Sequence, residues 1–309
     1  MKAKILVAAL AAAFLIARDA GAFHGNSDAA GARTQGQAYS QFLSGYLLYR
    51  EGDLDAALES YRKALRYQEN EPQILFEVAN VLVKQGKLAE AKQYLERALA
   101  IDPNHARSRY LLAGILAATG DREKAISLYA QSVANNPDIE EAYVHLSTLY
   151  AEKGEFGKAE EYLNTLIGMH PESFLAYYYR ARILAAQDKF EAALSDFDRS
   201  LSIHPAFEGA LLDSGGVLEL MGRHAEAEER YKMALALNPE NPVVRERLGR
   251  VLILEKKIDK AVDQYEELKK FEEGNLDFRT KLGLLYLDSD RYDDAINEFL
   301  FVLAAQPSG

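Results

Sequence analysis

The amino-acid sequence predicts an all-α fold built from eight copies of one helical hairpin. Three observations support this prediction. An alanine recurs every 34 residues, without insertion or deletion, from Ala57 to Ala295. Within each 34-residue unit, apolar side chains keep the three- and four-residue spacing of two amphipathic helices. Glycine and proline recur at fixed positions between these helical patterns, where each of them ends a helix.

Composition excludes several classes of protein. Hydrophobic residues make up 49% of the 309 residues and charged residues 27%, which indicates a chain that folds rather than a disordered or collagen-like one. The formal net charge of −11 opposes contact with phosphate backbones, so we expect no nucleic-acid partner. The sequence has no cysteine, which excludes disulfides, thiolate metal sites and cysteine nucleophiles.

The N-terminal segment is typical of an export signal. Residues 1–4 are short and basic, residues 5–17 form an uninterrupted apolar run, and Ala20–Ala22 gives a small-residue cleavage pattern. A membrane-spanning helix needs about 20 apolar residues, so we expect residues 1–22 to be a cleaved signal peptide of an exported, periplasmic protein. The alternatives are secretion, or an uncleaved segment that anchors the chain or forms a buried first helix. Residues 23–37 lack periodicity, and we expect a flexible leader there.

The repeats fill the remaining sequence. Counted from Ala38, position 8 is small, position 10 is aliphatic, position 11 is Leu or Tyr, position 20 is Ala and position 24 is large. Small residues at positions 8 and 20 let the two helices approach closely, and bulky residues fill the space around that contact. One hairpin cannot bury so much apolar surface, so we expect the hairpins to form one continuous stack. The expected repeats are 38–71, 72–105, 106–139, 140–173, 174–207, 208–241, 242–275 and 276–309.

Each hairpin contains its own stop signals. Position 15 is glycine in five repeats, such as Gly52, and a left-handed residue there would close the first helix. Position 32 is proline in six repeats, such as Pro103, which cannot continue the second helix. Lys256 and Asp290 replace the glycine in repeats 7 and 8, and Glu273 replaces the proline in repeat 7. We therefore expect these two hairpins to be looser or differently angled.

These features resemble the tetratricopeptide repeat, a helix-turn-helix unit of 34 residues. The resemblance covers residues 38–309. The chain departs from the family pattern because it contains no Trp, including at position 4, where the family often has one. The resemblance implies a right-handed superhelical solenoid whose first helices line a concave groove.

Sequence motifs for catalysis and metal binding are absent. No HExxH, GxSxG, P-loop or dinucleotide-binding pattern occurs. His170 and His204 share position 31, so they recur because a turn recurs. Adjacent carboxylates such as Glu140 and Glu141 point about 100° apart on a helix and do not converge as an acid–base pair. We expect a protein that is not an enzyme and has no cofactor and no metal site.

The resemblance places positions 2, 5, 9, 12 and 13 of each first helix on the concave face. Aromatic side chains there offer a large contact area at a small entropic cost, and asparagine can bond an extended backbone. The Lys and Asn pair with which chaperone-type repeats bind a C-terminal carboxylate is missing. We expect the groove to bind an extended peptide or a helix of a partner protein, although each aromatic residue could instead pack between repeats. The candidate groove residues are Tyr39, Phe42, Tyr46, Phe76, Asn80, Arg107, Tyr110, Tyr178, Arg182 and Arg250.

The last repeat contains a second apolar signal. Positions 25 and 26 are mostly polar in the earlier repeats, but here they are Leu300 and Phe301, which follow Phe299. Solenoids ordinarily end on a polar surface. We therefore expect Phe299, Leu300 and Phe301 to form a docking surface for a partner or for a second copy of the chain. The alternatives are a frayed terminus and a chain shortened from a longer one.

These patterns together predict a non-catalytic scaffold that binds proteins in an envelope, secretion, pilus or surface-polymer assembly. One alternative is an accessory subunit that positions a glycan- or peptidoglycan-modifying enzyme. Another is a membrane-tethered scaffold that keeps its N-terminal segment. The repeat pattern predicts a mode of binding and leaves the partner open.

Overall fold

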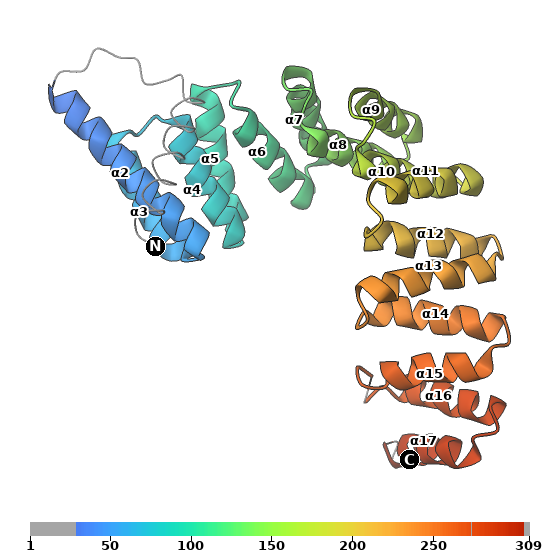
Figure 1. The fold of residues 1–309 in the computed structure, drawn as a ribbon. Coiled ribbons are helices and arrows are strands. Elements are labelled where there is room, and N and C mark those ends of the chain that lie inside the picture. The colour runs from blue at the N-terminus through green and yellow to red at the C-terminus, as the bar shows by residue number, and fades with distance from the viewer. Residues whose placement is uncertain (1–28, 273, 306–309) are drawn as a thin grey trace. The chain divides into compact units, whose positions relative to one another are not determined.

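The computed structural model describes residues 29–272 and 274–305, and within these ranges every regular element is an α-helix. This part of the chain forms sixteen helices, which follow one another as hairpins (Figure 1). The two helices of a hairpin pack together, and within each unit a second helix also packs on the next first helix, as α13 does on α14. The predicted all-α repeat fold is confirmed. The expected signal peptide lies outside the described residues.

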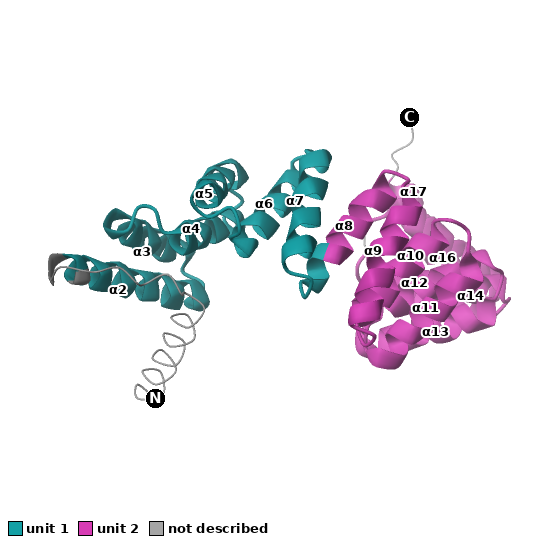
Figure 2. Ribbon diagram, turned by 90° about the horizontal axis from the view of Figure 1, so that it is seen from above, with its two compact units in different colours: residues 1–142 teal, residues 143–309 magenta. Residues whose placement is uncertain are grey.

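The chain divides into two compact units, residues 1–142 and 143–309 (Figure 2). The boundary falls within α8 (Glu140–Glu152). The first unit contains α2 (Ala29–Glu51), α3 (Leu54–Tyr67), α4 (Pro72–Lys84), α5 (Leu88–Ile101), α6 (Ala106–Ala118) and α7 (Arg122–Asn135). The second contains α9 (Phe156–Met169), α10 (Phe174–Ala185), α11 (Phe190–Ile203), α12 (Glu208–Leu220), α13 (His224–Leu237), α14 (Pro242–Leu254), α15 (Ile258–Leu268), α16 (Leu276–Asp288) and α17 (Tyr292–Ala305).

Helix α2 differs from the sequence expectation at its start. The other first helices begin at the first residue of their aligned repeats, from Pro72 in α4 to Leu276 in α16. Helix α2 instead begins at Ala29, so residues 29–37, which we expected to be a flexible leader, are helical. Alanine has the highest helix propensity, and lengthening an existing helix needs no new nucleus. The remaining leader residues, 23–28, lie outside the described part.

The turn inside each hairpin is the same in all eight repeats. Position 15 has a positive φ at the five glycines and also at Asp188 (58°), Lys256 (59°) and Asp290 (57°). In repeat 7 the Lys257 amide donates to the carbonyl of Leu252 at 2.8 Å, as the equivalent amide does in repeat 2 at 2.9 Å. The loosening expected at this turn in repeats 7 and 8 is therefore not observed. Repeat 7 differs instead in α15, which has 11 residues where α13 has 14.

The core of each hairpin combines a small residue at position 8 with a large one at position 24. The ring of Tyr231 is fully buried and lies on Gly215, where an added Cβ would approach the ring to 2.5 Å. Gly45 lies on Tyr61 in the same way: an added Cβ would be 2.8 Å from the ring, so there is no space for a side chain. The predicted close approach of the paired helices therefore depends on position 8.

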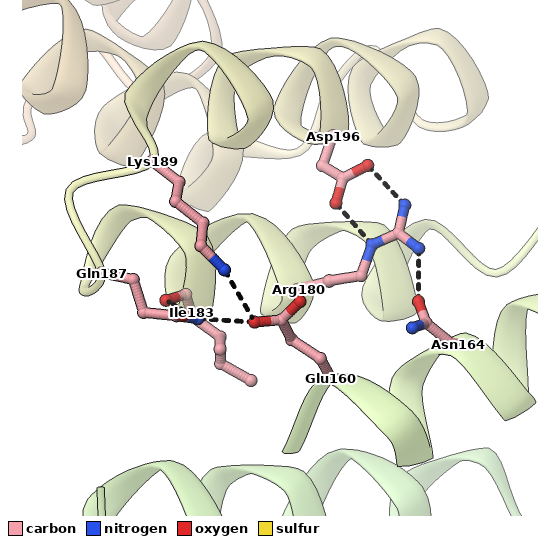
Figure 3. Close-up of polar contacts among 7 residues, drawn as sticks. All are labelled: Glu160, Asn164, Arg180, Ile183, Gln187, Lys189 and Asp196. Atoms are coloured by element: carbon pink, nitrogen blue, oxygen red, sulfur yellow. Dashed lines mark hydrogen bonds and ion pairs between the residues drawn. The ribbon is translucent and has the colours of Figure 1, made fainter. Parts of the chain in front are cut away.

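At the junction of α9, α10 and α11, position 7 is an arginine, whereas the other seven repeats have an aliphatic residue or serine there. Arg180 occupies position 7 of repeat 5 and donates to both carboxylate oxygens of Asp196, at 2.6 and 2.7 Å, and to Asn164 at 2.6 Å (Figure 3). Beside it, the Gln187 amide donates to Glu160 at 2.6 Å. These bonds connect α9, α10 and α11. A partly buried ion network therefore takes the place of aliphatic packing at this junction.

Candidate functional site

The candidate site is a pocket of about 560 Å³ on the first-helix face of the second unit. Three consecutive first helices, α10, α12 and α14, contribute its rim, and α11 contributes one floor residue. These helices present the pocket side chains together because the 34-residue period repeats the same helix face in every hairpin. The pocket is lined by Arg182, Ala185, Phe197, Asp213, Gly216, Val217, Glu219, Leu220, Arg247 and Arg250.

Ion pairs organise the charged side chains of this pocket. Arg250 from α14 reaches Glu219 of α12 with Nη2 at 2.7 Å and Nε at 3.1 Å. Arg247 lies 3.6 Å from the same carboxylate, and Arg182 of α10 lies 3.6 Å from Asp213. Three guanidinium groups therefore face two carboxylates. The pocket carries one net positive charge on a chain whose total charge is −11.

Two buried tyrosines hold these carboxylates in place. The Tyr178 hydroxyl donates to Asp213 at 2.9 Å, and the Tyr231 hydroxyl donates to Glu219. Burial raises the pKa of both phenols, and the neighbouring carboxylates raise it further, so both hydroxyls remain donors at neutral pH. Tyr178 is one of the expected groove residues. It holds Asp213 from the buried side of the pocket and does not present its ring face to a ligand.

Exposed leucines lie next to the charged side chains. Leu220 lines the pocket and is 73% exposed. Leu254 is 54% exposed and follows Arg250 by one helical turn, so the two share a face of α14. Arginine is enriched at protein interfaces, and the two leucines add apolar area beside the arginines of this face.

Sequence reasoning found Tyr178, Arg182 and Arg250 but missed their partners. Glu219 stands at position 12, one of the expected concave positions. Asp213 and Arg247 stand at position 6 of neighbouring repeats, which was not among those positions. The available signal was opposite charge at concave positions of adjacent repeats, as in Arg182 and Asp213 or Glu219 and Arg250.

In the first unit, the two expected groove phenylalanines are buried. Phe42 is 8% exposed and packs on the ring of Tyr61, at 5.5 Å between centroids. Phe76 is 6% exposed, and the guanidinium of Arg107 lies 4.2 Å above its ring. These rings therefore contribute to packing, the alternative that the sequence left open, and offer little surface to a partner.

A buried carboxylate joins the other expected residues of this region. Glu77 lies 3.3 Å from Arg107 and 2.8 Å from Gln73, and it also bonds Asn80. Burial raises the pKa of Glu77, and Arg107 with the two amides opposes that rise. The structure thus brings Phe76, Asn80 and Arg107 together around a residue that sequence reasoning did not identify.

The remaining expected groove residues of the first unit are half-buried. Tyr39 and Tyr46 lie on α2, and Tyr110 lies on α6 with its ring edge-on to Tyr129.

The expected docking surface on α17 is exposed at two of its three residues. Leu300 is 57% exposed and Phe301 is 42% exposed, with Arg279 at 4.3 Å from the Phe301 ring. Phe299 instead points into its own hairpin, where its ring lies on Gly283. Ile296 and Leu303, also exposed, continue the surface along the helix.

The described ranges show neither a cluster of metal-ligating side chains nor a helix that could span a membrane. Among residues 29–272 and 274–305, no group of three or more His, Asp and Glu side chains is placed to hold a metal ion. In the same ranges, no helix combines the length and the apolarity that crossing a bilayer requires.

Comparison with known proteins identifies the repeat. A family model described as tetratricopeptide repeat matches residues 48–115, 82–145 and 218–274, and a second model with the same description matches residues 146–207. No match is found among curated proteins.

Solved structures with low sequence identity share the fold. A tetratricopeptide repeat protein from Parabacteroides merdae is 17% identical, with a TM-score of 0.62 over 84% of this chain and 99% of the other. PilF of Pseudomonas aeruginosa is 18% identical, with a TM-score of 0.57 over 67% and 95%. A dimer of human IFIT1 with PPP-AAAA is 18% identical, with a TM-score of 0.53 over 87% and 72%. Together with the family models that span most of the helical region, these findings show that the chain belongs to the tetratricopeptide repeat family.

Proposed function

We propose that this protein is a non-catalytic scaffold that binds a segment of a partner protein on the first-helix face of its second unit. The observation that carries the proposal is the pocket on α10, α12 and α14, where fixed ion pairs lie beside exposed leucines. A tetratricopeptide repeat fold is consistent with a protein-binding adaptor.

The chemistry of the pocket supports a peptide or a helix as the bound segment. Arginine is enriched where protein interfaces concentrate their binding energy, and aliphatic contacts beside it exclude water from the charged bonds. Residues of three successive first helices line the pocket, which suits a ligand longer than a small metabolite. The rings of Phe42 and Phe76 are buried, which supports the second unit over the aromatic N-terminal groove as the proposed binding face.

Photo-crosslinking tests the binding face. A photoreactive residue at Leu220, in the pocket, should crosslink to one defined partner segment in cells that make both proteins. The matched control is the same residue at Met233, which is also exposed but lies on the second helix α13. Crosslinking of the same segment from both positions, or from Met233 alone, would exclude the pocket as the binding face.

Export to the cell envelope is the second part of the proposal, and the N-terminal pattern supports it. We propose a role in an envelope, secretion or surface assembly, with cleavage before Phe23. Mass spectrometry of the protein from the exported fraction should give Phe23 as its first residue. A first residue of Met1 would instead favour the membrane-tethered alternative, and an enzyme as the crosslinked partner would favour the accessory-subunit alternative.

A further inference from the structure

We propose that α17 pairs with α17 of a second copy of this chain, in an antiparallel arrangement about a two-fold axis. This surface is separate from the pocket of the proposed function, so either proposal can fail without the other. Four large side chains of α17 are more than half exposed, and their spacing of four, four and three residues puts them on one face of the helix. They are Tyr292 (57%), Ile296 (53%), Leu300 (57%) and Leu303 (67%).

The equivalent face of the preceding second helix binds a helix. Val262 of α15 occupies the same repeat position as Ile296, and it is only 1% exposed. It belongs to one apolar cluster with Leu282 and Leu285 of α16, the helix that packs on α15. The exposed face of α17 therefore has the chemistry that accepts an amphipathic helix, and such a helix must present an apolar row of its own.

The spacing of the four side chains fits a second α17 that runs in the opposite direction. Their positions are nearly symmetric about the level of Glu298. In an antiparallel pair about that level, Ile296 of each copy lies opposite Leu300 of the other. Tyr292 of each copy then lies opposite Leu303 of the other. The contact is self-complementary, because each copy covers the apolar row of the other with the same surface.

The two ends of this face differ in charge. The first turn of α17 is acidic, with Asp293 and Asp294. The C-terminal half borders a pocket of about 530 Å³, which is lined by Glu266, Lys269, Lys270, Gly274, Arg279 and Phe301. Three cations thus stand beside one carboxylate in that lining. Even with the buried Glu298, which Lys269 and Arg279 hold, this end is more positive than the first turn.

This difference in charge favours antiparallel over parallel pairing. An antiparallel pair puts the acidic turn of each copy beside the more positive end of the other, and the two helix dipoles then oppose each other. A parallel pair would bring the two acidic turns together, and like charges in contact are costly. The charge and the symmetric spacing therefore select the same arrangement.

Disulfide crosslinking tests this arrangement, because the sequence has no cysteine of its own. Tyr292→Cys and Leu303→Cys, each in the full chain, are oxidised separately and as a mixture. In the antiparallel pair, the two copies of residue 292 are about 17 Å apart along the helix, which is too far for a disulfide. Residue 292 of one copy and residue 303 of the other lie at nearly the same level. The mixture should therefore crosslink at least several-fold faster than either variant alone.

A mixture of Met233→Cys and Leu303→Cys gives the background rate, since Met233 is exposed on α13, away from the proposed contact. Faster crosslinking of either α17 variant with itself than in their mixture would indicate a parallel pair and overturn the proposal. Background rates in every sample would also overturn it, and would leave this face to a partner of another sequence.

Removing one carboxylate tests the direction of pairing independently. Asp293→Asn should raise the dissociation constant of the dimer a few-fold in the antiparallel arrangement, whereas it would lower that constant in a parallel one. The matched control is Asp259→Asn, because Asp259 is exposed in the first turn of α15 at the same repeat position. Both variants lose a carboxylate from a helix N-terminus, so any effect on helix stability is shared. Sedimentation velocity gives both constants, and an unchanged or lower value for Asp293→Asn than for the control would overturn the proposal.

Discussion

The small residue at position 8 and the large residue at position 24 determine how closely the two helices of a hairpin can lie. Four repeats have glycine at position 8, and in each of them a Cβ would come within 2.8 Å of the ring at position 24. Real Cβ atoms do not approach other atoms so closely, so the ring or a helix would have to move. These contacts are also why the phase of the repeat is so clear in the sequence.

Gly215→Ala tests this contact. The added methyl group would lie 2.5 Å from Tyr231, so we expect the free energy of unfolding to fall by about 1–3 kcal/mol. Urea unfolding followed by circular dichroism measures the change. The control is Gly157→Ala in α9, where nothing lies within 4 Å and alanine favours the helix. An equal loss in both variants would show that packing against Tyr231 is not the cause.

At the scale of helices, a buried carboxylate connects repeat 6 to repeat 7. Glu228 of α13 is buried, and it lies 2.7 Å from Lys232 of the same helix and 2.6 Å from Lys257, which follows α14. Burial raises the pKa of Glu228, but hydrogen bonds with the two lysines and with Glu255 together outweigh that effect and lower it to about 2.

This pKa gives stability a defined dependence on pH. The ordinary pKa of this carboxyl group, 4.5, lies above its pKa in the folded protein. The stabilisation that the ionised Glu228 side chain provides is therefore complete above about pH 4.5 and is lost as the pH falls towards 2. We expect it to be on the order of 2 kcal/mol, because both lysines are partly exposed. Glu228→Gln should lower stability at pH 7 and bring it closer to the parent at pH 2.5. Parallel stability curves for the two proteins between pH 7 and pH 2.5 would contradict this assignment.

The ion pair between Arg180 and Asp196 allows a test of how polar contacts stabilise the packing of α10 on α11. Asp196→Ala removes the carboxylate that accepts two hydrogen bonds from the partly buried guanidinium of Arg180. The free energy of unfolding should fall by about 3 kcal/mol. The double variant Arg180→Leu, Asp196→Leu copies the residues at positions 7 and 23 of repeat 3, Leu112 and Leu128. It should unfold within about 1 kcal/mol of the parent. Equal losses in the single and double variants would show that aliphatic packing cannot replace the ion pair here.

At the scale of helices, the sequence predicted where helices begin but not which aromatic side chains a neighbouring helix covers. Helix starts could be predicted because Gly, Pro and the apolar spacing act locally and recur every 34 residues. The burial of Phe42 and Phe76 could not, because it depends on Tyr61 and on an arginine from the following repeat. A concave position in one helix does not specify whether a neighbouring helix covers the side chain.

At the scale of the whole molecule, the regular sequence period does not mark the boundary between the two compact units. The 34-residue spacing runs through residues 142 and 143 without a change, so it predicted one stack and gave no sign of the two units. Unit boundaries depend on how densely neighbouring hairpins pack, which the spacing alone does not encode. The candidate pocket lies within the second unit, so its geometry depends on that unit alone.

The last prediction concerns self-association through the exposed face of α17. Ile296, Leu300 and Leu303 are spaced by four and three residues and form one exposed apolar stripe. The corresponding residues at positions 21 and 28 of repeat 5, Leu194 and Leu201, are buried. Apolar side chains exposed in this way favour association, so we expect this chain to self-associate in a concentration-dependent manner.

Analytical ultracentrifugation of the parent and of the double variant Leu300→Glu, Phe301→Glu measures this association. Charges on α17 should shift the weight-average mass to that of the monomer across the whole concentration range, because the carboxylate at position 300 would be buried at the interface. The control Leu220→Glu puts a carboxylate on another exposed leucine, in the pocket, and should leave self-association unchanged. Monomeric behaviour of the parent at every concentration would exclude a second copy as the occupant of this face.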